Sequence, residues 1–158
     1  MAFNLELKIR IESFRQFENI LKKNRAEYKE TLKQKDIYYK FNHGLLKLRV
    51  ENETYTLIKY FRDEYNKRWS NYELLELKGK DPEKYLNEIL TQEVVVEKSR
   101  KLYLYNNTRI HLDEVKNLGK FLELETLLIS DRKEATKRFN EMKLLLGIEN
   151  AEEIRKSY

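Results

Sequence analysis

Charged and apolar side chains alternate with a period of two in four short segments of this chain, at residues 5–11, 46–50, 108–113 and 121–125. Successive side chains of a β-strand point to opposite faces, so each segment would carry its charges on one face and its aliphatic groups on the other. The second segment carries only cations and the last only carboxylates. This sorting indicates a site where a polyanion is held through cations and a metal ion.

The segments that must position these charges have the patterns of strands separated by a few helices. We expect strands at 4–11, 36–41, 45–51, 54–62, 68–78, 93–105, 108–115 and 120–129. We expect helices from an N-cap at Ser13 to about Arg25, from Asp81 to about Leu90, from Ser130 or Asp131 to Gly147, and a last short one over 150–156. Short turns between several of the strands favour antiparallel pairing.

Two architectures accommodate strands that are charged on one face. A closed antiparallel barrel would place the charges in a polar lumen, with helices packed on its apolar exterior, and closure would remove the exposed sheet edges. An open sheet would instead turn its charged face to water. The alternation of side chains alone leaves both open.

The composition limits the class of protein. The chain has 158 residues, no Cys and a net charge of +5, with 37% charged residues. This length predicts one domain over 1–158, and the excess of cations agrees with an anionic partner. We see no signal-peptide pattern and no apolar run of the ~18 residues that cross a bilayer. We therefore expect a soluble, cytoplasmic protein, either a monomer or a homodimer, that does not bind membranes.

Six motifs in order resemble those of the CYTH family, the triphosphate tunnel metalloenzymes. They are Asn4-Leu5-Glu6-Leu7-Lys8, Gln34 to Tyr39, Leu46 to Arg49, Val96 to Arg100, Ile110 to Val115, and Phe121 to Glu125. The family includes class IV adenylate cyclases, thiamine triphosphatases and inorganic triphosphatases. The resemblance implies an α+β fold, with a tunnel of eight antiparallel strands that holds a triphosphate and Mg²⁺ or Mn²⁺.

The resemblance also implies roles for individual residues. The metal ligands would be Glu6, Glu123 and Glu125, with Asp113 as a further acidic member. The phosphates would be bound by Lys8, Lys47, Arg49, Lys98 and Arg100, with Arg10, Arg62 and Arg109 in the tunnel wall and Lys156 in a Lys-x-Tyr ending. Lys8, Arg49 and Asp113 would act in catalysis, with Asp113 or a metal-bound hydroxide activating the water.

The residue types suit this chemistry. Mg²⁺ prefers carboxylate, water and phosphate oxygens, and phosphoryl transfer mainly needs positioning and charge neutralisation. Arginine can clamp a phosphate with two parallel hydrogen bonds, whereas lysine acts as a point charge. Without the resemblance, Lys8, Arg49 and the Glu123/Glu125 pair would more often be solvated strand positions. We interpret His111 as a wall residue or a structural histidine.

Two positions depart from the simplest pattern. Asn4 stands where the fullest form of the family motif has its first Glu, so a second metal ion that needs this charge would bind more weakly. In residues 56–62, alternation places Lys59 on the face opposite Tyr60 and Arg62, so only one of these two faces can line a tunnel. We expect it to be the face with Arg62.

Three functions remain open at this point. The first is metal-dependent hydrolysis of a small triphosphate such as tripolyphosphate, thiamine triphosphate or ATP. The second is the class IV adenylate cyclase reaction, which converts ATP to cyclic AMP and pyrophosphate. The third is a module that binds polyphosphate or nucleotide without turnover. We do not expect nucleic acid as a partner, because its binding would favour exposed aromatics on an open basic surface.

Overall fold

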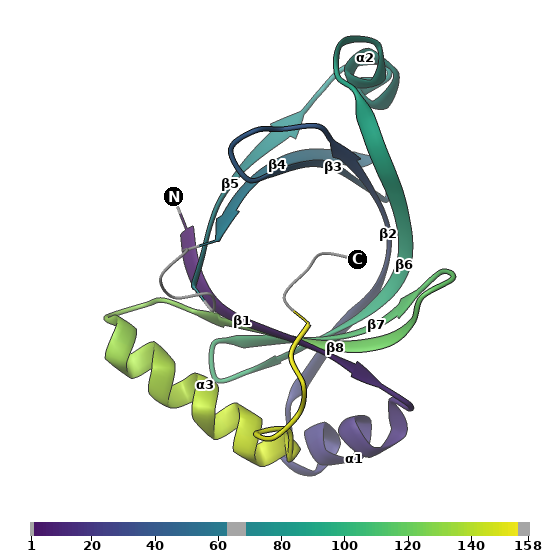
Figure 1. Cartoon of the computed structure of the whole chain (residues 1–158). Coiled ribbons are helices and arrows are strands. Elements are labelled where there is room, and N and C mark those ends of the chain that lie inside the picture. The colour runs from purple at the N-terminus through teal and green to yellow at the C-terminus, as the bar shows by residue number, and fades with distance from the viewer. Residues whose placement is uncertain (1, 63–68, 155–158) are drawn as a thin grey trace.

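The computed structural model describes residues 2–62 and 69–154, and it shows a ring of strands with helices outside it (Figure 1). The strands are β1 (Ala2–Ile11), β2 (Glu27–Tyr39), β3 (Leu45–Glu51), β4 (Thr54–Arg62), β5 (Trp69–Leu77), β6 (Gln92–Tyr105), β7 (Thr108–Val115) and β8 (Gly119–Leu127). The helices are α1 (Arg15–Lys23), α2 (Pro82–Ile89) and α3 (Arg132–Leu146). In the described part, these helices are too short and too polar to span a bilayer.

The strands close into a barrel in the order β1-β5-β4-β3-β2-β6-β7-β8, and every neighbouring pair is antiparallel. The predicted α+β fold with a closed eight-stranded antiparallel barrel is therefore confirmed, and the open sheet is excluded. Hairpin turns join β3 to β4 at Asn52-Glu53 and β6 to β7 at Asn106-Asn107, where all four residues have positive φ. Turns of this kind match the right-handed twist of the paired strands.

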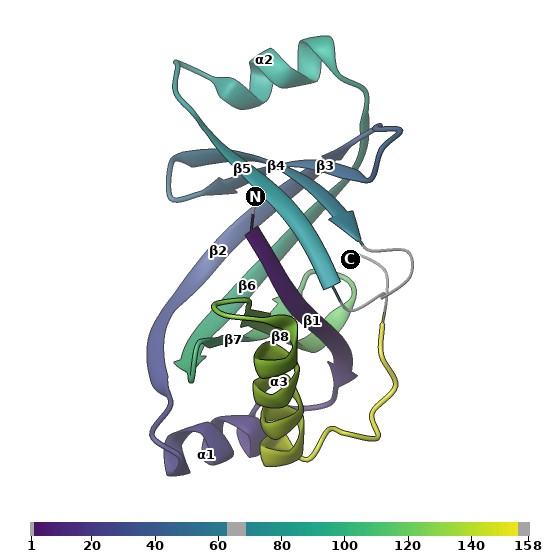
Figure 2. The ribbon, with the colours of Figure 1, turned by 90° about the vertical axis from the view of Figure 1, so that its left-hand side faces the viewer.

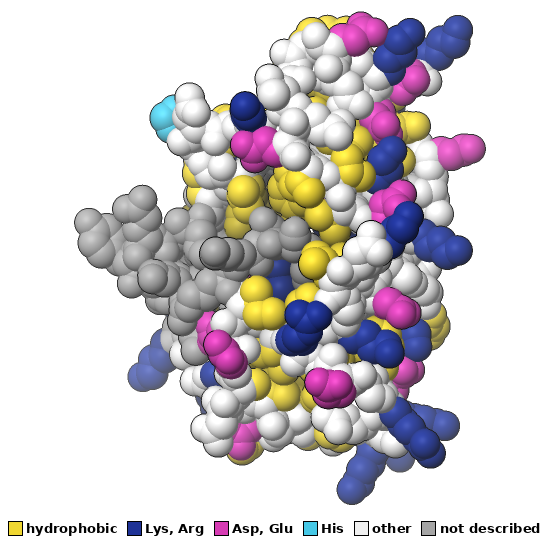
Figure 3. Space-filling model, turned by 45° about the vertical axis from the view of Figure 1, so that its right-hand side comes forward, with side chains coloured by type: hydrophobic (Ala, Val, Ile, Leu, Met, Phe, Trp, Pro, Cys, Tyr) yellow, Lys and Arg dark blue, Asp and Glu magenta, His cyan; other side chains and the backbone are white. Residues whose placement is uncertain are grey.

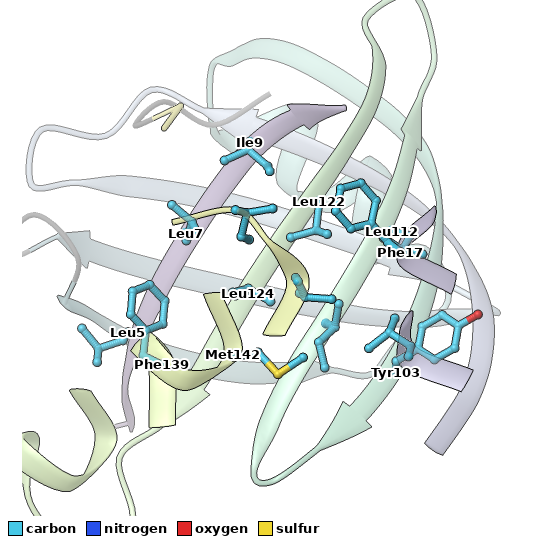
Figure 4. Close-up of a cluster of buried hydrophobic side chains, with 14 of the residues drawn as sticks. Leu5, Leu7, Ile9, Phe17, Tyr103, Leu112, Leu122, Leu124, Phe139 and Met142 are labelled. Atoms are coloured by element: carbon cyan, nitrogen blue, oxygen red, sulfur yellow. The ribbon is translucent and has the colours of Figure 1, made fainter. Parts of the chain in front are cut away.

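The largest hydrophobic core lies outside the barrel, between its wall and two helices (Figure 4). Leu5, Leu7 and Ile9 alternate along β1 and pack with apolar side chains of β7, β8, α1 and α3, including Phe139 and Met142 of α3. A second core lies beneath α2, on the far side of the ring from α1 and α3 (Figure 2). Each fully buried Leu or Ile contributes about 1.5–3 kcal/mol, so these two cores stabilise the wall from outside the lumen.

The register places charges of opposite sign beside one another in the wall. Lys8 of β1 pairs with Glu123 of β8. Arg49 of β3 pairs with Asp36 of β2, and the next two strands repeat the arrangement with Arg100 opposite Asp113. Cross-strand neighbours on one face lie about 5 Å apart. The barrel therefore holds its cations next to carboxylates from adjacent strands.

Helix ends follow the predicted signals in two of the three helices. Asp81 accepts a hydrogen bond from the backbone N–H of Lys84, and Asp131 does the same for Glu134. Gly147 ends α3 in the left-handed conformation. The prediction for Ser13 is wrong, because α1 begins at Arg15 with Phe14 as its N-cap.

Two further predictions differ from the structure. β2 begins at Glu27, well before the predicted start at residue 36. The sequence did not indicate this start, because residues 27–31 are exposed and show no apolar face, although they pair with β6. The predicted helix over 150–156 is absent from its described part, residues 150–154. There Glu153 forms a β-bridge with Ile9, and the N–H of Ile154 donates to the carbonyl of Lys8.

Candidate functional site

The lumen of the barrel contains a cavity of about 280 Å³. Its lining combines side chains of all eight strands, because alternate residues of each strand point inward. The charged residues in the lining are Glu6, Lys8, Lys47, Arg49, Lys98, Arg100, Arg109, Glu123, Glu125 and Glu153. The structure thus brings together most of the residues that the sequence predicted for a metal and phosphate site.

Carboxylates gather on the wall formed by β1, β7 and β8. One ligand atom each of His111, Glu123 and Glu125 lies within 4.8 Å of the others. Nδ1 of His111 is 3.1 Å from Oε1 of Glu123 and 3.8 Å from Oε1 of Glu125. Glu6 is the direct cross-strand partner of Glu125, and its carboxylate accepts a hydrogen bond from the hydroxyl of Tyr60.

The carboxylate cluster carries opposing electrostatic effects. Burial, together with the charges of Glu123 and Glu6, raises the pKa of Glu125 to about 7 although His111 opposes this. Burial also acts to raise the pKa of Glu123, but Arg100 and the hydrogen bond with His111 hold it well below the usual range. A proton on Glu125 therefore reduces the repulsion between the carboxylates when no cation is bound.

These residues fit a divalent metal ion. Three carboxylates supply hard oxygen ligands, and the imidazole of His111 supplies a nitrogen beside them. Asn4 lines the cavity at 1% exposure, and within the described residues its Oδ1 has no hydrogen-bond partner. An unsatisfied buried oxygen is costly, and a cation or a hydrated ligand in the lumen would satisfy it.

Cations gather around a fully buried carboxylate, Asp36 of β2. Arg49 donates to both of its oxygens at 2.8 Å, while Nζ of Lys98 and Nζ of Lys47 lie 2.8 Å and 3.3 Å from Oδ2. Burial acts to raise the pKa of Asp36, but these cations keep it well below the usual range. Burial and the nearby charge of Arg100 lower the pKa of Lys98 to about 7. One carboxylate therefore orients three cations without neutralising all of them.

Arg100 has a carboxylate partner of its own. Its guanidinium donates to both oxygens of Asp113, at 2.8 Å and 2.7 Å, and lies 3.7 Å from Glu123. Asp113 is fully buried. This geometry favours a role for Asp113 in positioning Arg100 over the predicted role as the base that activates water.

The remaining predicted residues lie in different places. Arg109 is in the lining, 3.1 Å from Glu125 and 3.3 Å from the hydroxyl of Tyr72. Arg10 is an exposed residue whose guanidinium lies over the ring of Phe121 and donates to the carbonyl of Leu118. The structure does not bring it into the cavity lining.

Strand β4 presents one set of side chains to the lumen, as expected. Tyr60 lines the cavity, whereas Lys59 is 41% exposed and pairs with Glu73 at 3.1 Å. The side chain of Arg62 lies outside the described residues, as does Lys156, so their predicted roles stay predictions.

Two residues of the site, Asp36 and Tyr60, received no role from the sequence, and a third, His111, was expected only as a wall residue or a structural histidine. Asp36 is the centre of the cation cluster, Tyr60 donates to a predicted metal ligand, and His111 lies within the carboxylate cluster. Alternation could have indicated His111, since it shares a face with Arg109 and Asp113. The partners of Asp36 depend on strand order and could not be found from local sequence.

The comparison with a family model agrees with this geometry, because the model of the CYTH domain matches residues 2–158. The chain belongs to the CYTH family. The predicted family assignment is thereby confirmed. The sequence has no significant match among curated proteins.

Solved structures share the CYTH fold of this chain over nearly its whole length. A protein from Pyrococcus horikoshii is 24% identical with a TM-score of 0.81, covering 98% of this chain and 96% of its own. A candidate adenylate cyclase from Vibrio parahaemolyticus is 20% identical with a TM-score of 0.73, covering 99% and 95%. A candidate adenylyl cyclase from Hippeastrum, described as having a dominant triphosphatase activity, is 14% identical with a TM-score of 0.65, covering 94% and 89%. At these sequence identities, the structural similarity shows a shared fold only.

Proposed function

We propose that this protein is a divalent-metal-dependent enzyme that binds a small-molecule triphosphate in the barrel lumen and hydrolyses it. The observation that carries the proposal is the meeting of two clusters in one cavity. Glu6, Glu123 and Glu125 line one part of it, and a set of cations oriented by Asp36 and Asp113 lines another. Membership in the CYTH family supports the same activity.

The protein side chains have distinct tasks in this proposal. Lys47, Arg49, Lys98 and Arg100 grip the phosphate chain and neutralise the charge that develops on it. Lys8 enters from β1, where its cross-strand neighbour is Glu123, so it would contact the phosphate nearest the metal. Glu6, Glu123 and Glu125 would hold Mg²⁺ or Mn²⁺, with Asn4 and His111 beside them. A divalent ion held there would supply Lewis-acid chemistry at the phosphates.

Binding of a metal ion at the carboxylates and binding of phosphates at the cations should favour each other. Burial and the neighbouring cations lower the pKa values of Lys47 and Lys98, and a bound phosphate chain would favour their charged forms. Burial and the charges of Glu123 and Glu6 raise the pKa of Glu125, and a bound divalent ion would favour its charged form. We therefore expect metal and triphosphate to bind with positive coupling.

The test is turnover by the full chain with Mg²⁺ or Mn²⁺ and tripolyphosphate, thiamine triphosphate or ATP. We expect release of phosphate that EDTA abolishes, and product analysis separates it from cyclic AMP and pyrophosphate. Glu123→Gln should abolish turnover and weaken metal binding, whereas Glu114→Gln, an exposed position on the same hairpin, should not. Binding of these compounds without any turnover would overturn the proposed hydrolysis, and so would wild-type rates in Glu123→Gln.

A further inference from the structure

One sector of the lumen wall is apolar and aromatic instead of charged. Leu45 of β3, Ile58 and Tyr60 of β4, and Tyr72 and Leu74 of β5 all line the cavity. They form a continuous patch, because Leu45 pairs with Tyr60, Tyr60 with Tyr72, and Ile58 with Leu74. Three adjacent strands thus contribute one surface whose aliphatic groups and aromatic rings cannot themselves hold phosphate or metal.

This patch exposes large apolar side chains inside a cavity. Leu74 is 59% exposed and Leu45 is 36% exposed, while Ile58 between them is 7% exposed. Leaving apolar surface in contact with water costs about 25 cal/mol per Å², and exposed apolar patches in hollows commonly mark ligand sites. In the space-filling view, hydrophobic side chains gather in the middle of one face of the barrel (Figure 3).

The apolar patch adjoins the charged groups at defined points. Lys47 is the cross-strand neighbour of Ile58. The hydroxyl of Tyr60 donates to Glu6, and the hydroxyl of Tyr72 accepts a hydrogen bond from Arg109 at 3.3 Å. Both tyrosines therefore direct their hydroxyls toward the charged clusters while their rings belong to the patch. A ligand that is polyanionic at one end and apolar at the other would match this boundary.

We propose that this patch, formed by Leu45, Ile58, Tyr60, Tyr72 and Leu74, holds the organic group of the substrate. The substrate class is then a triphosphate ester of a heterocyclic compound, with the ring against the leucines and tyrosines and the phosphates against the cations. Flat rings gain from contact with aromatic side chains in offset or edge-to-face geometry. The inference rests on the proposed function and narrows it, since bare tripolyphosphate would leave the patch unused.

Strand β5 offers a matched pair of variants to test this. Leu74 and Leu75 are adjacent and equally exposed, at 59% each, but only Leu74 lines the cavity. We compare kcat/KM for ATP, thiamine triphosphate, ribose 5-triphosphate and tripolyphosphate in the wild type, Leu74→Asn and Leu75→Asn. We expect the wild type to prefer at least one heterocyclic ester over both compounds that lack the ring. Leu74→Asn should reduce that preference about tenfold, and Leu75→Asn should leave it unchanged.

The outcomes separate this inference from the proposed function. Turnover in which tripolyphosphate is the best substrate, or an equal effect of the two substitutions, would overturn the apolar subsite while hydrolysis stands. If no compound is turned over, calorimetric titration of the wild type with ATP and with tripolyphosphate decides. Tighter binding of ATP that Leu74→Asn removes would keep the subsite without hydrolysis, and equal or absent binding would overturn it.

Discussion

Arg100 and Asp113 face each other across β6 and β7 and share two hydrogen bonds of 2.8 Å and 2.7 Å. Both side chains are buried, and Arg100 also reaches within 3.7 Å of Glu123. The pair therefore connects the cation cluster to the carboxylate cluster. It fixes the guanidinium in one orientation before any ligand arrives, which reduces the entropy lost on binding.

Asp113→Asn should weaken both the fold and the activity. Removing one partner of a buried ion pair leaves an uncompensated charge and typically costs about 3–5 kcal/mol. We expect a loss of that order in the free energy of unfolding, measured with urea, and a lower kcat with a raised KM as Arg100 loses its orientation. Asp113→Glu, which keeps the charge, should recover part of the kcat. If Asp113 were instead the base, Asp113→Asn would lower kcat and leave KM unchanged.

Asp36 gives the protein a dependence on acid pH. Its pKa in the folded state is held well below the usual range by Lys47, Arg49 and Lys98, against the effect of burial. In the unfolded chain the pKa is about 3.9. A carboxyl whose pKa is lower in the folded state stabilises the fold fully at pH values above its unfolded pKa. This stabilisation is lost as the pH falls toward its folded pKa.

The corresponding variant is Asp36→Asn, which cannot ionise. We expect it to be less stable than the wild type by about 3–5 kcal/mol near neutral pH. The difference in the free energy of unfolding should shrink as pH falls below about 4, where the wild-type carboxylate is also being protonated. Urea titrations at several pH values measure this. A difference that stays constant down to strongly acid pH would contradict the assignment.

The strands could be predicted because alternation of charged and aliphatic side chains is a local signal that several segments repeat. Alternation alone also allowed an open sheet, and the closed barrel was implied by the family resemblance. The residues predicted to bind metal and phosphate followed from that same alternation and from the family resemblance. Other features depend on contacts between distant segments. Residues 27–31 lack an apolar face, and their pairing with β6 is not visible locally. Residues 150–154 are not helical, since a turn and a bend lead into Glu153, which bridges to Ile9 of β1, a contact that local helix propensity cannot indicate.

The raised pKa of Glu125 predicts that metal binding depends on pH. Burial and the charges of Glu123 and Glu6 bring this pKa to about 7, so the folded protein holds a proton that the unfolded chain releases near 4.3. A cation must displace that proton, and its affinity should therefore rise as pH increases through 7. Because the folded pKa lies above the unfolded one, the metal-free protein loses stability as pH rises from about 4.3 to about 7.

Calorimetric titration with Mn²⁺, without substrate, tests this at about pH 6 and about pH 8. We expect tighter binding at the higher pH together with proton release that varies with the buffer used. Glu125→Gln should bind Mn²⁺ more weakly and lose most of the pH dependence. Equal affinity of the wild type at both pH values would show that Glu125 is not the group that the metal displaces.

Asn4 is the position at which one added charge should change metal binding most. Its side chain is 1% exposed in the cavity lining, on the same face of β1 as Glu6. Asn4→Glu would place a further carboxylate at the margin of the cluster. Because affinity for hard cations grows with ligand charge, we expect Mn²⁺ to bind roughly tenfold tighter and triphosphate turnover to increase.

The same substitution should weaken the metal-free protein. A fourth carboxylate beside Glu6, Glu123 and Glu125 adds repulsion in a buried site, and we expect a loss of about 1–3 kcal/mol in the free energy of unfolding. Added Mn²⁺ should reverse this loss through its preference for the folded state. Asn4→Gln is the matched control, because it has the length of Glu without the charge. If Asn4→Glu and Asn4→Gln bind Mn²⁺ equally, the residue at position 4 does not contribute to the metal site.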